Sequence, residues 1–310
     1  MAGPDIEVQR RPRLTEREIH AVQHLVELST DIDGVRPLSE HVMLHLRYGG
    51  DEPTRNLLVW QDDELAGYAH LDTTDVVAGA SAELAVAPSF RRRGVGRALV
   101  QALADDAGDG RLRLWSHGAQ PAASALAESM GFKQERVLWQ MRRSLFAPVP
   151  APQWPTGVEV RTFVVGQDEE EWLAVNNRSF AEHPEQGGWS LDDLRMRENE
   201  PWFDPEGFFL AVKDGHVVGF HWTKIHGARS QSSHPHDHEP IGEVYVVGVD
   251  PSMQGQHLGP ALTLRGLQHL RAVGLPQVML YVDDTNTNAI GVYERLGFAK
   301  WDVDICFRRQ

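Results

Sequence analysis

The chain has 310 residues, enough for about two domains of ~150 residues, and its 41% share of hydrophobic residues excludes a disordered tail or a fibre. With 30 Lys and Arg against 44 Asp and Glu, the formal net charge is −14, which excludes broad binding to nucleic acid or anionic lipid, so an anionic ligand needs a local cationic site. A single cysteine, Cys306, excludes an intrachain disulfide framework and is typical of a reducing compartment.

The first fourteen residues are charged and carry no apolar stretch, so we expect 1–14 to be a disordered tail rather than a secretory signal. No apolar run approaches the ~18 residues that a membrane-spanning helix needs. These features favour a cytoplasmic location with no membrane partner and no nucleic-acid partner, and we expect a monomer.

The segment 15–146 carries alternating helix and strand signals. Thr15-Glu-Arg-Glu18 has the spacing of a helix capping box ahead of an apolar face. Residues 56–68 indicate a strand, a charged turn and a strand, and Glu83–Pro88 indicates an apolar strand ended by proline. After them come a helix with one apolar face, a short strand, a small helix, the dipeptide Gly131-Phe132 and a strand that ends in paired arginines.

A proline-rich stretch divides the chain near its midpoint. Residues 147–155 hold four prolines in nine positions. Each proline fixes φ and removes a backbone donor, which favours an extended segment. We therefore expect 147–155 to be a linker between an N-terminal domain at 15–146 and a C-terminal domain at 156–310.

The second half repeats the order of the first. Ser190 precedes two aspartates as a helix start, residues 208–220 indicate strand, turn and strand, and Val246–Pro251 is again an apolar strand ended by proline. A helix, a short strand, a small helix, Gly297-Phe298 and a last strand with paired arginines follow in the same order. The repeat predicts one α/β fold used twice, each copy a central mixed β-sheet flanked by helices.

The junction Arg91-Arg-Arg-Gly-Val-Gly96 lies between a strand and a helix. Glycines at such a place let the backbone curl, so that unpaired N–H groups at the positive end of the helix dipole can hold a phosphate or pyrophosphate. The arginines make this junction the densest positive patch in an acidic chain. A Walker loop would need a Lys-Ser/Thr pair and a dinucleotide fingerprint a third glycine, and this junction has neither.

These residues resemble the GCN5-related N-acetyltransferases (GNAT), whose acetyl-CoA loop reads Gln/Arg-x-x-Gly-x-Gly/Ala. The resemblance covers about residues 15–145 and again 156–309, and it implies acetyl-CoA as cosubstrate, with no metal. The second copy of the loop, Gln254-Gly-Gln-His-Leu-Gly259, departs from the pattern because His257 replaces the first glycine and no Arg or Lys is present. The resemblance implies acetyl-CoA contacts from Leu84, Ala85, Val86, Arg92, Arg93, Gly94, Val95, Gly96, Arg97, Val247, Gly248, Val249, Gln254, Gly255, Gln256, His257, Leu258, Gly259, Pro260, Asn286, Thr287, Asn288, Ala289, Ile290 and Gly291.

The two halves differ at the position of the expected acid. Acetyl transfer from a thioester to an amine needs a base for the ammonium, a donor for the oxyanion and an acid for the leaving thiolate. Aligning the two Gly-Phe dipeptides places Ala127 opposite Tyr293, four residues before the glycine, where the family commonly has a tyrosine acid. The alternative for Tyr293 is a helix tyrosine packed on the sheet.

The halves also differ at the position of the expected base. Aligning the strand-ending prolines places Ala80 opposite Glu243, and Glu83 is expected on the other strand face unless a bulge intervenes. We therefore predict catalysis in the second half, with Glu243 as a base acting through water and a bulged backbone N–H near Val247 as the oxyanion donor. The alternative for Glu243 is a solvated carboxylate at a strand edge.

A closer resemblance is to the tandem, mycothiol-forming members of this family. It is carried by His183-Pro-Glu-Gln-Gly-Gly-Trp189, Trp202-Phe-Asp-Pro205, Gly219-Phe-His-Trp-Thr-Lys224, Gly242–Pro251 and Leu280-Tyr-Val282. The resemblance implies acetylation of the cysteinyl amine of a cysteinyl-glucosaminyl-inositol, a thiol-sugar substrate, by the second half. It also implies substrate contacts from Glu40, Glu185, Lys224, Glu243 and Tyr281.

Two other functions fit the sequence. A tandem acetyltransferase could act on another small amine, such as an aminoglycoside or a peptide N-terminus, or the chain could be a non-catalytic CoA-binding sensor. His234-Pro-His-Asp-His238 has three alternating histidines, but it lies in an insertion that we expect to be a solvated loop, and we predict no metal there. Cys306 is expected to be a small buried apolar residue.

Overall fold

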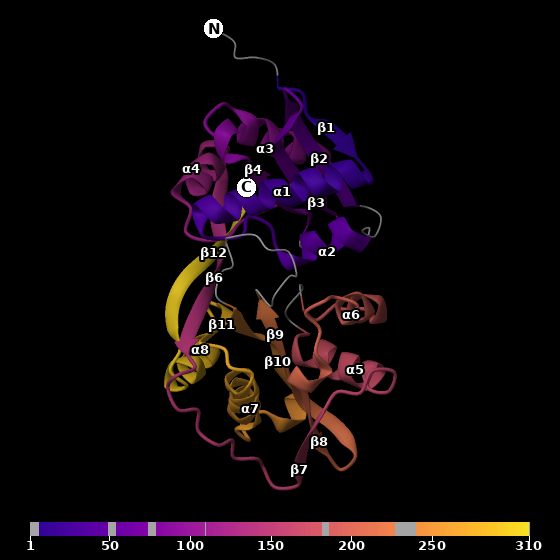
Figure 1. Ribbon diagram of the computed structural model, residues 1–310, viewed down its shortest axis with the longest axis vertical. Helices are drawn as coiled ribbons and strands as arrows, with labels where there is room; N and C mark the ends of the chain where they lie inside the picture. The colour runs from indigo at the N-terminus through magenta and orange to yellow at the C-terminus, as the bar shows by residue number, and fades with distance from the viewer. Residues whose placement is uncertain are drawn as a thin grey trace. The chain divides into compact units, whose positions relative to one another are not determined.

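The computed structural model describes residues 6–48, 54–73, 79–108, 110–181, 186–226 and 240–309. The chain divides into two compact units (Figure 1). Unit 1 comprises Met1–Trp139 together with Asp302–Gln310, and unit 2 comprises Gln140–Trp301.

Unit 1 is a mixed sheet with helices. Its strand order is β1-β2-β3-β4-β5-β12, in which the β4–β5 pair is parallel and the β1–β2, β2–β3, β3–β4 and β5–β12 pairs are antiparallel. The elements are β1 (Gln9–Arg11), α1 (Glu16–Asp33), α2 (Glu40–Tyr48), β2 (Thr54–Gln61), β3 (Glu64–Asp72), β4 (Ser81–Val86), a 3₁₀ turn (Pro88–Phe90), α3 (Val95–Asp106), β5 (Arg113–Ser116), α4 (Pro121–Ser129), the start of β6 (Phe132–Ser144) and the end of β12 (Ala299–Arg309).

Unit 2 repeats this plan. Its strand order is β7-β8-β9-β10-β11-β6, with β10 parallel to β11 and the β7–β8, β8–β9 and β9–β10 pairs antiparallel. The elements are β7 (Val158–Thr162), α5 (Glu169–Ser179), α6 (Leu191–Glu198), a 3₁₀ turn (Pro205–Gly207), β8 (Phe208–Lys213), β9 (His216–His226), β10 (Ile241–Val249), a 3₁₀ turn (Pro251–Met253), α7 (Leu258–Ala272), β11 (Gln277–Asp283) and α8 (Thr287–Arg295). The predicted α/β class, with a mixed sheet flanked by helices in each copy, is confirmed.

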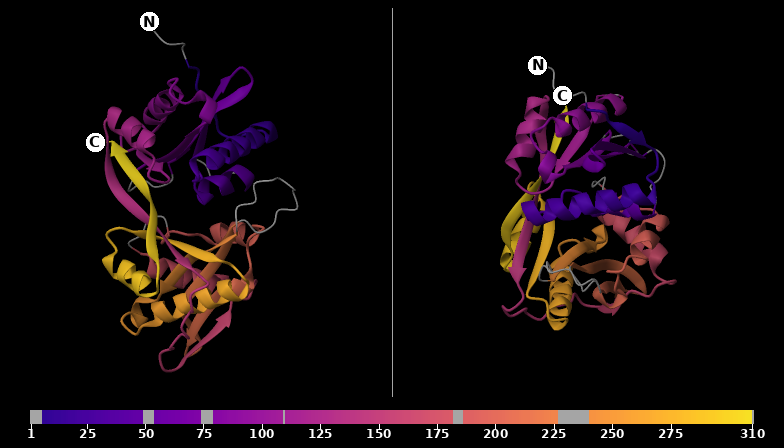
Figure 2. Two further views of the ribbon diagram at one scale, coloured as in Figure 1. Left: turned by 60° about the vertical axis from the view of Figure 1, so that its left-hand side comes forward. Right: turned by 45° about the horizontal axis from the view of Figure 1, so that its top comes forward.

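The closing strand of each unit comes from the other half of the sequence. The end of β12 pairs with β5, so that Cys306 lies opposite Trp115, while β6 lies beside β11. Figure 2 shows the yellow end of β12 among the indigo and magenta elements of unit 1. Cys306 is buried as expected.

The boundary between the two compact units therefore does not lie at the expected linker. The segment 147–155 contains no helix or strand, in line with its prolines, but it lies inside unit 2, and the units change at residues 139–140 and 301–302. The physical reason is the length of β6 and β12, 13 and 11 residues, against a usual ~5–6. Strands of this length can begin in one unit and end in the other, and a repeat in sequence does not indicate which sheet they complete.

The expectation of a disordered 1–14 tail is also corrected. Gln9–Arg11 pairs with β2, and Ile6, Val8 and Leu14 pack against the core of unit 1. The strand has three residues and none of them is apolar, so the sequence carries no alternation that would indicate it. Residues 1–5 lie outside the described part of the chain.

Local signals placed the helix starts correctly. The side chains of Thr15 and Ser190 each accept a hydrogen bond from the backbone N–H of the third helical residue. The side chains of these third residues, Glu18 and Asp193, accept one from the backbone N–H of the capping residue. These reciprocal bonds satisfy donors that a helix start leaves free. Among the helices that the structure describes, none combines the length and apolar character needed to cross a membrane.

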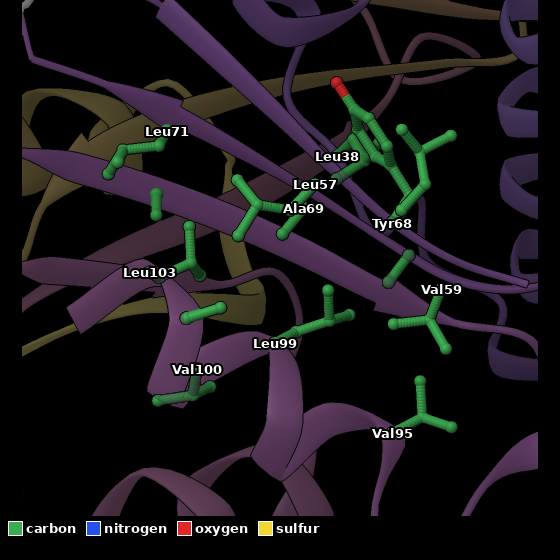
Figure 3. Close-up of a cluster of buried hydrophobic side chains, with 14 of the residues drawn as sticks. Leu38, Leu57, Val59, Tyr68, Ala69, Leu71, Val95, Leu99, Val100 and Leu103 are labelled. Carbon is green, nitrogen blue, oxygen red and sulfur yellow. The ribbon is translucent and has the colours of Figure 1, made fainter. Parts of the chain in front are cut away.

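A glycine in each sheet lets the helix after the predicted loop lie close to the strands. A Cβ at Gly67 would lie 2.7 Å from Val95, and a Cβ at Gly219 would lie 3.1 Å from Leu258 and Leu262. Figure 3 shows strand residues of the unit 1 core facing Leu99 and Leu103 of α3. This packing fixes the starts of α3 and α7 over their sheets.

Candidate functional site

A cavity of about 490 Å³ lies in unit 1 where two parallel strands separate. β4 and β5 are paired from Ser81 to Glu83. Leu84, Ala85 and Val86, which follow the last paired residue of β4, line the cavity on one side, and residues 114–116 at the end of β5 line it on the other. Backbone groups on a strand that has left its neighbour are available to an extended ligand.

The loop before α3 forms one end of this cavity. Gly94 is the capping residue of α3 with φ of 93°, and Arg92 has φ of 63°. This left-handed backbone turns the first N–H groups of α3 outward, as an anion site requires. Gly94, Gly96, Arg92 and Arg97 all line the cavity, as the sequence predicted for a phosphate loop.

The arginines of this loop have different roles. Arg91 forms a two-pronged ion pair with Asp33 at 2.7 and 2.6 Å, so its charge is committed to holding α1. The guanidinium of Arg93 lies 5.6 Å from the Phe90 ring, and Arg97 donates to Ser129 at 2.8 Å. The cationic character of the loop therefore depends on Arg92, Arg93 and Arg97 rather than on the whole run.

The unit 1 cavity has an alanine at the position of the expected tyrosine acid. Ala127 is buried and lines the cavity at the position that Tyr293 holds in the second copy. His117, which also lines it, lies between two carboxylates: Nε2 is 3.3 Å from Glu83 Oε2 and Nδ1 is 3.0 Å from Asp304 Oδ2.

Glu83 is consequently a weak base. Burial alone would raise its pKa, but the charge of His117 and hydrogen bonds from His117 and the Ser39 backbone lower the pKa of Glu83 to about 2. Burial alone would lower the pKa of His117, yet Glu83 and Asp304 raise it to about 10. At neutral pH this cluster holds an imidazolium between two carboxylates.

The strand register shows on which face of the sheet Glu83 lies. β3 and β4 pair without a break, with Asp72 opposite Ser81 and His70 opposite Glu83. Counting from the matched glycines of β3 and β9, the counterpart of Glu243 is therefore Ser81 rather than Ala80. Because Ser81 and Glu83 are two residues apart, Glu83 lies on the same face as that counterpart, not on the opposite face.

The break that shifts this register lies in unit 2. β9 and β10 pair with an irregularity between Val244 and Val246, so Tyr245 is the extra residue of a bulge. The expected bulge near Val247 is thus two residues earlier, and Val247 pairs with His221. The parallel pairing of β10 with β11 is recorded at Gly242 and Glu243, next to the bulge.

Glu243 is a buried carboxylate, not a solvated one. It is 7% exposed, lies opposite Lys224 in the register and is 2.6 Å from Nε2 of His226 through its Oε2. Burying a carboxylate without a partner is costly, so His226 stabilises it there. Sequence reasoning missed His226, although it lies two residues from Lys224 on the same face of β9.

Aromatic side chains surround the other predicted substrate residues of unit 2. The ammonium of Lys224 lies 4.3 Å from the Trp202 ring centre and 5.2 Å from that of Tyr245, positions typical of cation–π contacts. The Tyr281 hydroxyl accepts a hydrogen bond from Gln140 at 2.8 Å. Trp202, Tyr245 and Gln140 are thus additional candidates.

Tyr293 is a half-buried residue of α8. Its ring lies 5.9 Å from that of Phe298, and burial raises the pKa of Tyr293 to about 12. The phenol therefore holds its proton at neutral pH, as an acid must. Asn286 caps α8 by accepting from the Ala289 backbone at 3.1 Å, so its side chain has a structural role there.

The second copy of the loop offers fewer contacts for an anion. His257 caps α7 with φ of 60°, a left-handed conformation that costs a residue with a Cβ about 1–2 kcal/mol. Pro260, at the position of Arg97, supplies neither a backbone N–H nor a charge. Gln254, Gly255 and Gln256 are exposed beside them.

The remaining predicted residues have separate positions. Glu40 is the first residue of α2 in unit 1, whereas Lys224, Glu243 and Tyr281 belong to unit 2. Glu185 and His234–His238 lie outside the described residues. Within the described ranges, no group of three or more His, Cys, Asp or Glu side chains is arranged to hold a metal ion.

Comparison with known proteins identifies the family. The model of the acetyltransferase (GNAT) family matches residues 22–132 and 171–298. The chain belongs to the GNAT family. GNAT proteins use acetyl-CoA, and this GNAT chain is an acetyltransferase with the predicted tandem arrangement.

Relatives match nearly the whole of this GNAT chain. A mycothiol acetyltransferase of Streptosporangium roseum is 54% identical, covering 97% of this chain and 99% of the relative. A mycothiol acetyltransferase of Acidothermus cellulolyticus is 56% identical, covering 98% and 95%. Among solved structures, a tandem GNAT protein from the clavulanic acid biosynthesis pathway has a TM-score of 0.73 at 18% identity, covering 98% of each chain, and so shares the fold.

Proposed function

We propose that the chain acetylates the cysteinyl amine of cysteinyl-glucosaminyl-inositol with acetyl-CoA, which forms mycothiol, and that unit 2 carries out the reaction. The observation that carries this proposal is the 54–56% identity, over nearly the full length, to proteins named mycothiol acetyltransferase. The difference between the units supports the choice of unit 2, because Glu243 and Tyr293 have no equivalents among the residues that line the unit 1 cavity.

Glu243 acts as the base in this proposal. A free α-amino group has a reference pKa of ~7.7–8.0 against ~10.4 for lysine, so its neutral form costs only about 1–1.4 kcal/mol at pH 7. A buried carboxylate that acts through one water is sufficient for this task. Lys224 and Tyr281, beside it in the same unit, would hold the hydroxyl-rich substrate by hydrogen bonds.

Tyr293 and the bulge complete the proposed reaction. Acetyl-CoA supplies the thioester whose carbonyl the amine attacks. The backbone N–H that the bulge at Tyr245 leaves unpaired would stabilise the oxyanion. Tyr293, protonated at neutral pH, would then give its proton to the departing thiolate.

Unit 1 would hold acetyl-CoA without using it. The cavity, the turn at Gly94 and the cationic loop fit a pyrophosphate and a pantetheine arm. Ala127 cannot donate a proton, and Glu83 is held as an ion pair.

Comparison of acceptors tests this function. Acetyl transfer should be far faster to cysteinyl-glucosaminyl-inositol than to cysteine methyl ester or an aminoglycoside. Glu243→Gln should lower turnover by about 10²–10⁴-fold, because the substrate ammonium then has no positioned base. Glu294→Gln, an exposed change on α8, is the matched control. Equal rates with all acceptors would overturn the substrate assignment, and normal turnover of Glu243→Gln would overturn the base.

A further inference from the structure

The buried Glu243 is linked to a more exposed histidine on the neighbouring strand. His226 Nε2 lies 2.6 Å from Glu243 Oε2, and the His226 side chain is 30% exposed. The register explains the contact, because Ile241 lies opposite His226 and Glu243 opposite Lys224. Residues two apart share a face, so His226, Lys224 and Glu243 lie on one face of the β9–β10 pair.

Several polar groups in the described part of unit 2 near this pair have contacts of their own. Lys224 lies over the rings of Trp202 and Tyr245. The Tyr245 hydroxyl accepts from Arg197 Nε at 2.9 Å. The neighbour of Glu243 on β11 is Met279, which has no charge. His226 lies within hydrogen-bond distance of the carboxylate of the proposed base.

We propose that His226 is a positioning residue for Glu243. Its Nε2–H donates to Oε2, which fixes the rotamer of the carboxylate and leaves Oε1 for the water next to the substrate amine. This inference rests on the proposed function, in which Glu243 is the base. The overall reaction converts an ammonium and a thioester to an amide, a thiol and one released proton. That proton passes from the ammonium through water to Oε1 and then to solvent, and His226 keeps its own proton.

Two substitutions distinguish a hydrogen-bond donor at position 226 from a side chain that only fills space there. His226→Phe keeps a ring but removes the donor, and we expect kcat to fall about 10–100-fold. The KM for acetyl-CoA should not change. His226→Gln retains an N–H at similar reach, and its kcat should stay within about threefold of the parent.

A double variant tests whether His226 acts through Glu243. If it does, His226→Phe should cause no further loss of kcat when Glu243→Gln is already present. A further loss in the double variant would overturn the proposal, as would an equal fall in His226→Gln and His226→Phe. Normal turnover of Glu243→Gln alone would instead refute the base, and the role of His226 with it. Thermal unfolding and acetyl-CoA binding of each variant establish that the loss is not one of folding.

Discussion

Units 1 and 2 share a fold but differ at the residues that the proposed reaction needs, and each difference can be traced to single positions. In unit 1, β3 and β4 pair without a break, and the carboxylate on the relevant face is neutralised by His117. In unit 2, a bulge at Tyr245 shifts the register and presents Glu243 beside His226. Conversely, the anion loop of unit 1 has its capping glycine, its backbone N–H donors and its positive charge. The corresponding loop of unit 2 lacks that glycine, one backbone N–H donor and the positive charge. The comparison teaches that the residues of the anion loop and those of the proposed acid–base pair can vary independently in one fold.

The largest expected effect is on the buried cluster of unit 1. His117→Ala would leave Glu83 and Asp304 as buried carboxylates without their cation, and the free energy of unfolding should fall by about 3–5 kcal/mol. His20→Ala, an exposed change on α1, is the control. Because the pKa of His117 is raised to about 10, its contribution is complete below the unfolded pKa of ~6.5 and is lost as pH rises toward about 10. Urea unfolding from pH 6 to 10 measures the stability lost in the variant and the pH dependence of the parent. A parent protein whose free energy of unfolding is constant over that range would contradict the ion pair.

The next effect makes unit 2 resemble unit 1. Tyr293→Phe removes the proposed acid, as Ala127 does in unit 1, and we expect turnover to fall about 100-fold, or ~2.7 kcal/mol of transition-state stabilisation. Acetyl-CoA binding, followed by calorimetry, should not change. Unaltered turnover would mean that the thiolate leaves without this acid. The difference between Tyr293 and Ala127 would then not explain why unit 2 is the catalytic one.

A smaller effect concerns the loop of unit 2. His257→Gly relieves a left-handed residue with a Cβ, so we expect the unfolding free energy to rise by about 0.5–1 kcal/mol and the KM for acetyl-CoA to fall. The matched variant is Gly94→Ala in unit 1. Because φ of Gly94 is 93°, this variant should lower the free energy of unfolding. If both variants shift stability in the same direction, the two turns are not equivalent.

The smallest effect separates the arginines of unit 1. Arg93→Ala should weaken acetyl-CoA binding to unit 1 several-fold, a loss of about 0.5–1 kcal/mol, with turnover unchanged. Arg91→Ala should instead lower the melting temperature, because it leaves Asp33 unpaired. Calorimetry that resolves two acetyl-CoA sites measures the first, and a collapse of turnover in a folded Arg93→Ala would reverse the division between the units.

Features set by neighbouring residues could be predicted from the sequence. The capping boxes, the proline-ended strands, the left-handed turn at Gly94 and the contrast between Ala127 and Tyr293 all depend on short spacings that repeat in the two halves. The resemblance to a family then indicated which of these positions to compare.

Features that join distant segments could not be predicted. His117 and Asp304 are 187 residues apart, and nothing near either residue indicates the other. The bulge at Tyr245 adds one residue to an unbroken apolar run, so the alternation of faces expected from β10 was wrong beyond it. His226 looked like an ordinary strand residue because its partner is on another strand.

Because each unit is closed by a strand from the other half of the sequence, the order of synthesis determines when each unit can be completed. Residues 302–309, which pair with β5 and carry Asp304, are synthesised after everything else that unit 1 contains. While the nascent chain emerges from the ribosome, β5 has an open edge and the His117 cluster lacks one carboxylate. Unit 1 is therefore the first to be translated and the last to be completed, and a ribosome that stops at the proline-rich segment releases a sheet without its final strand.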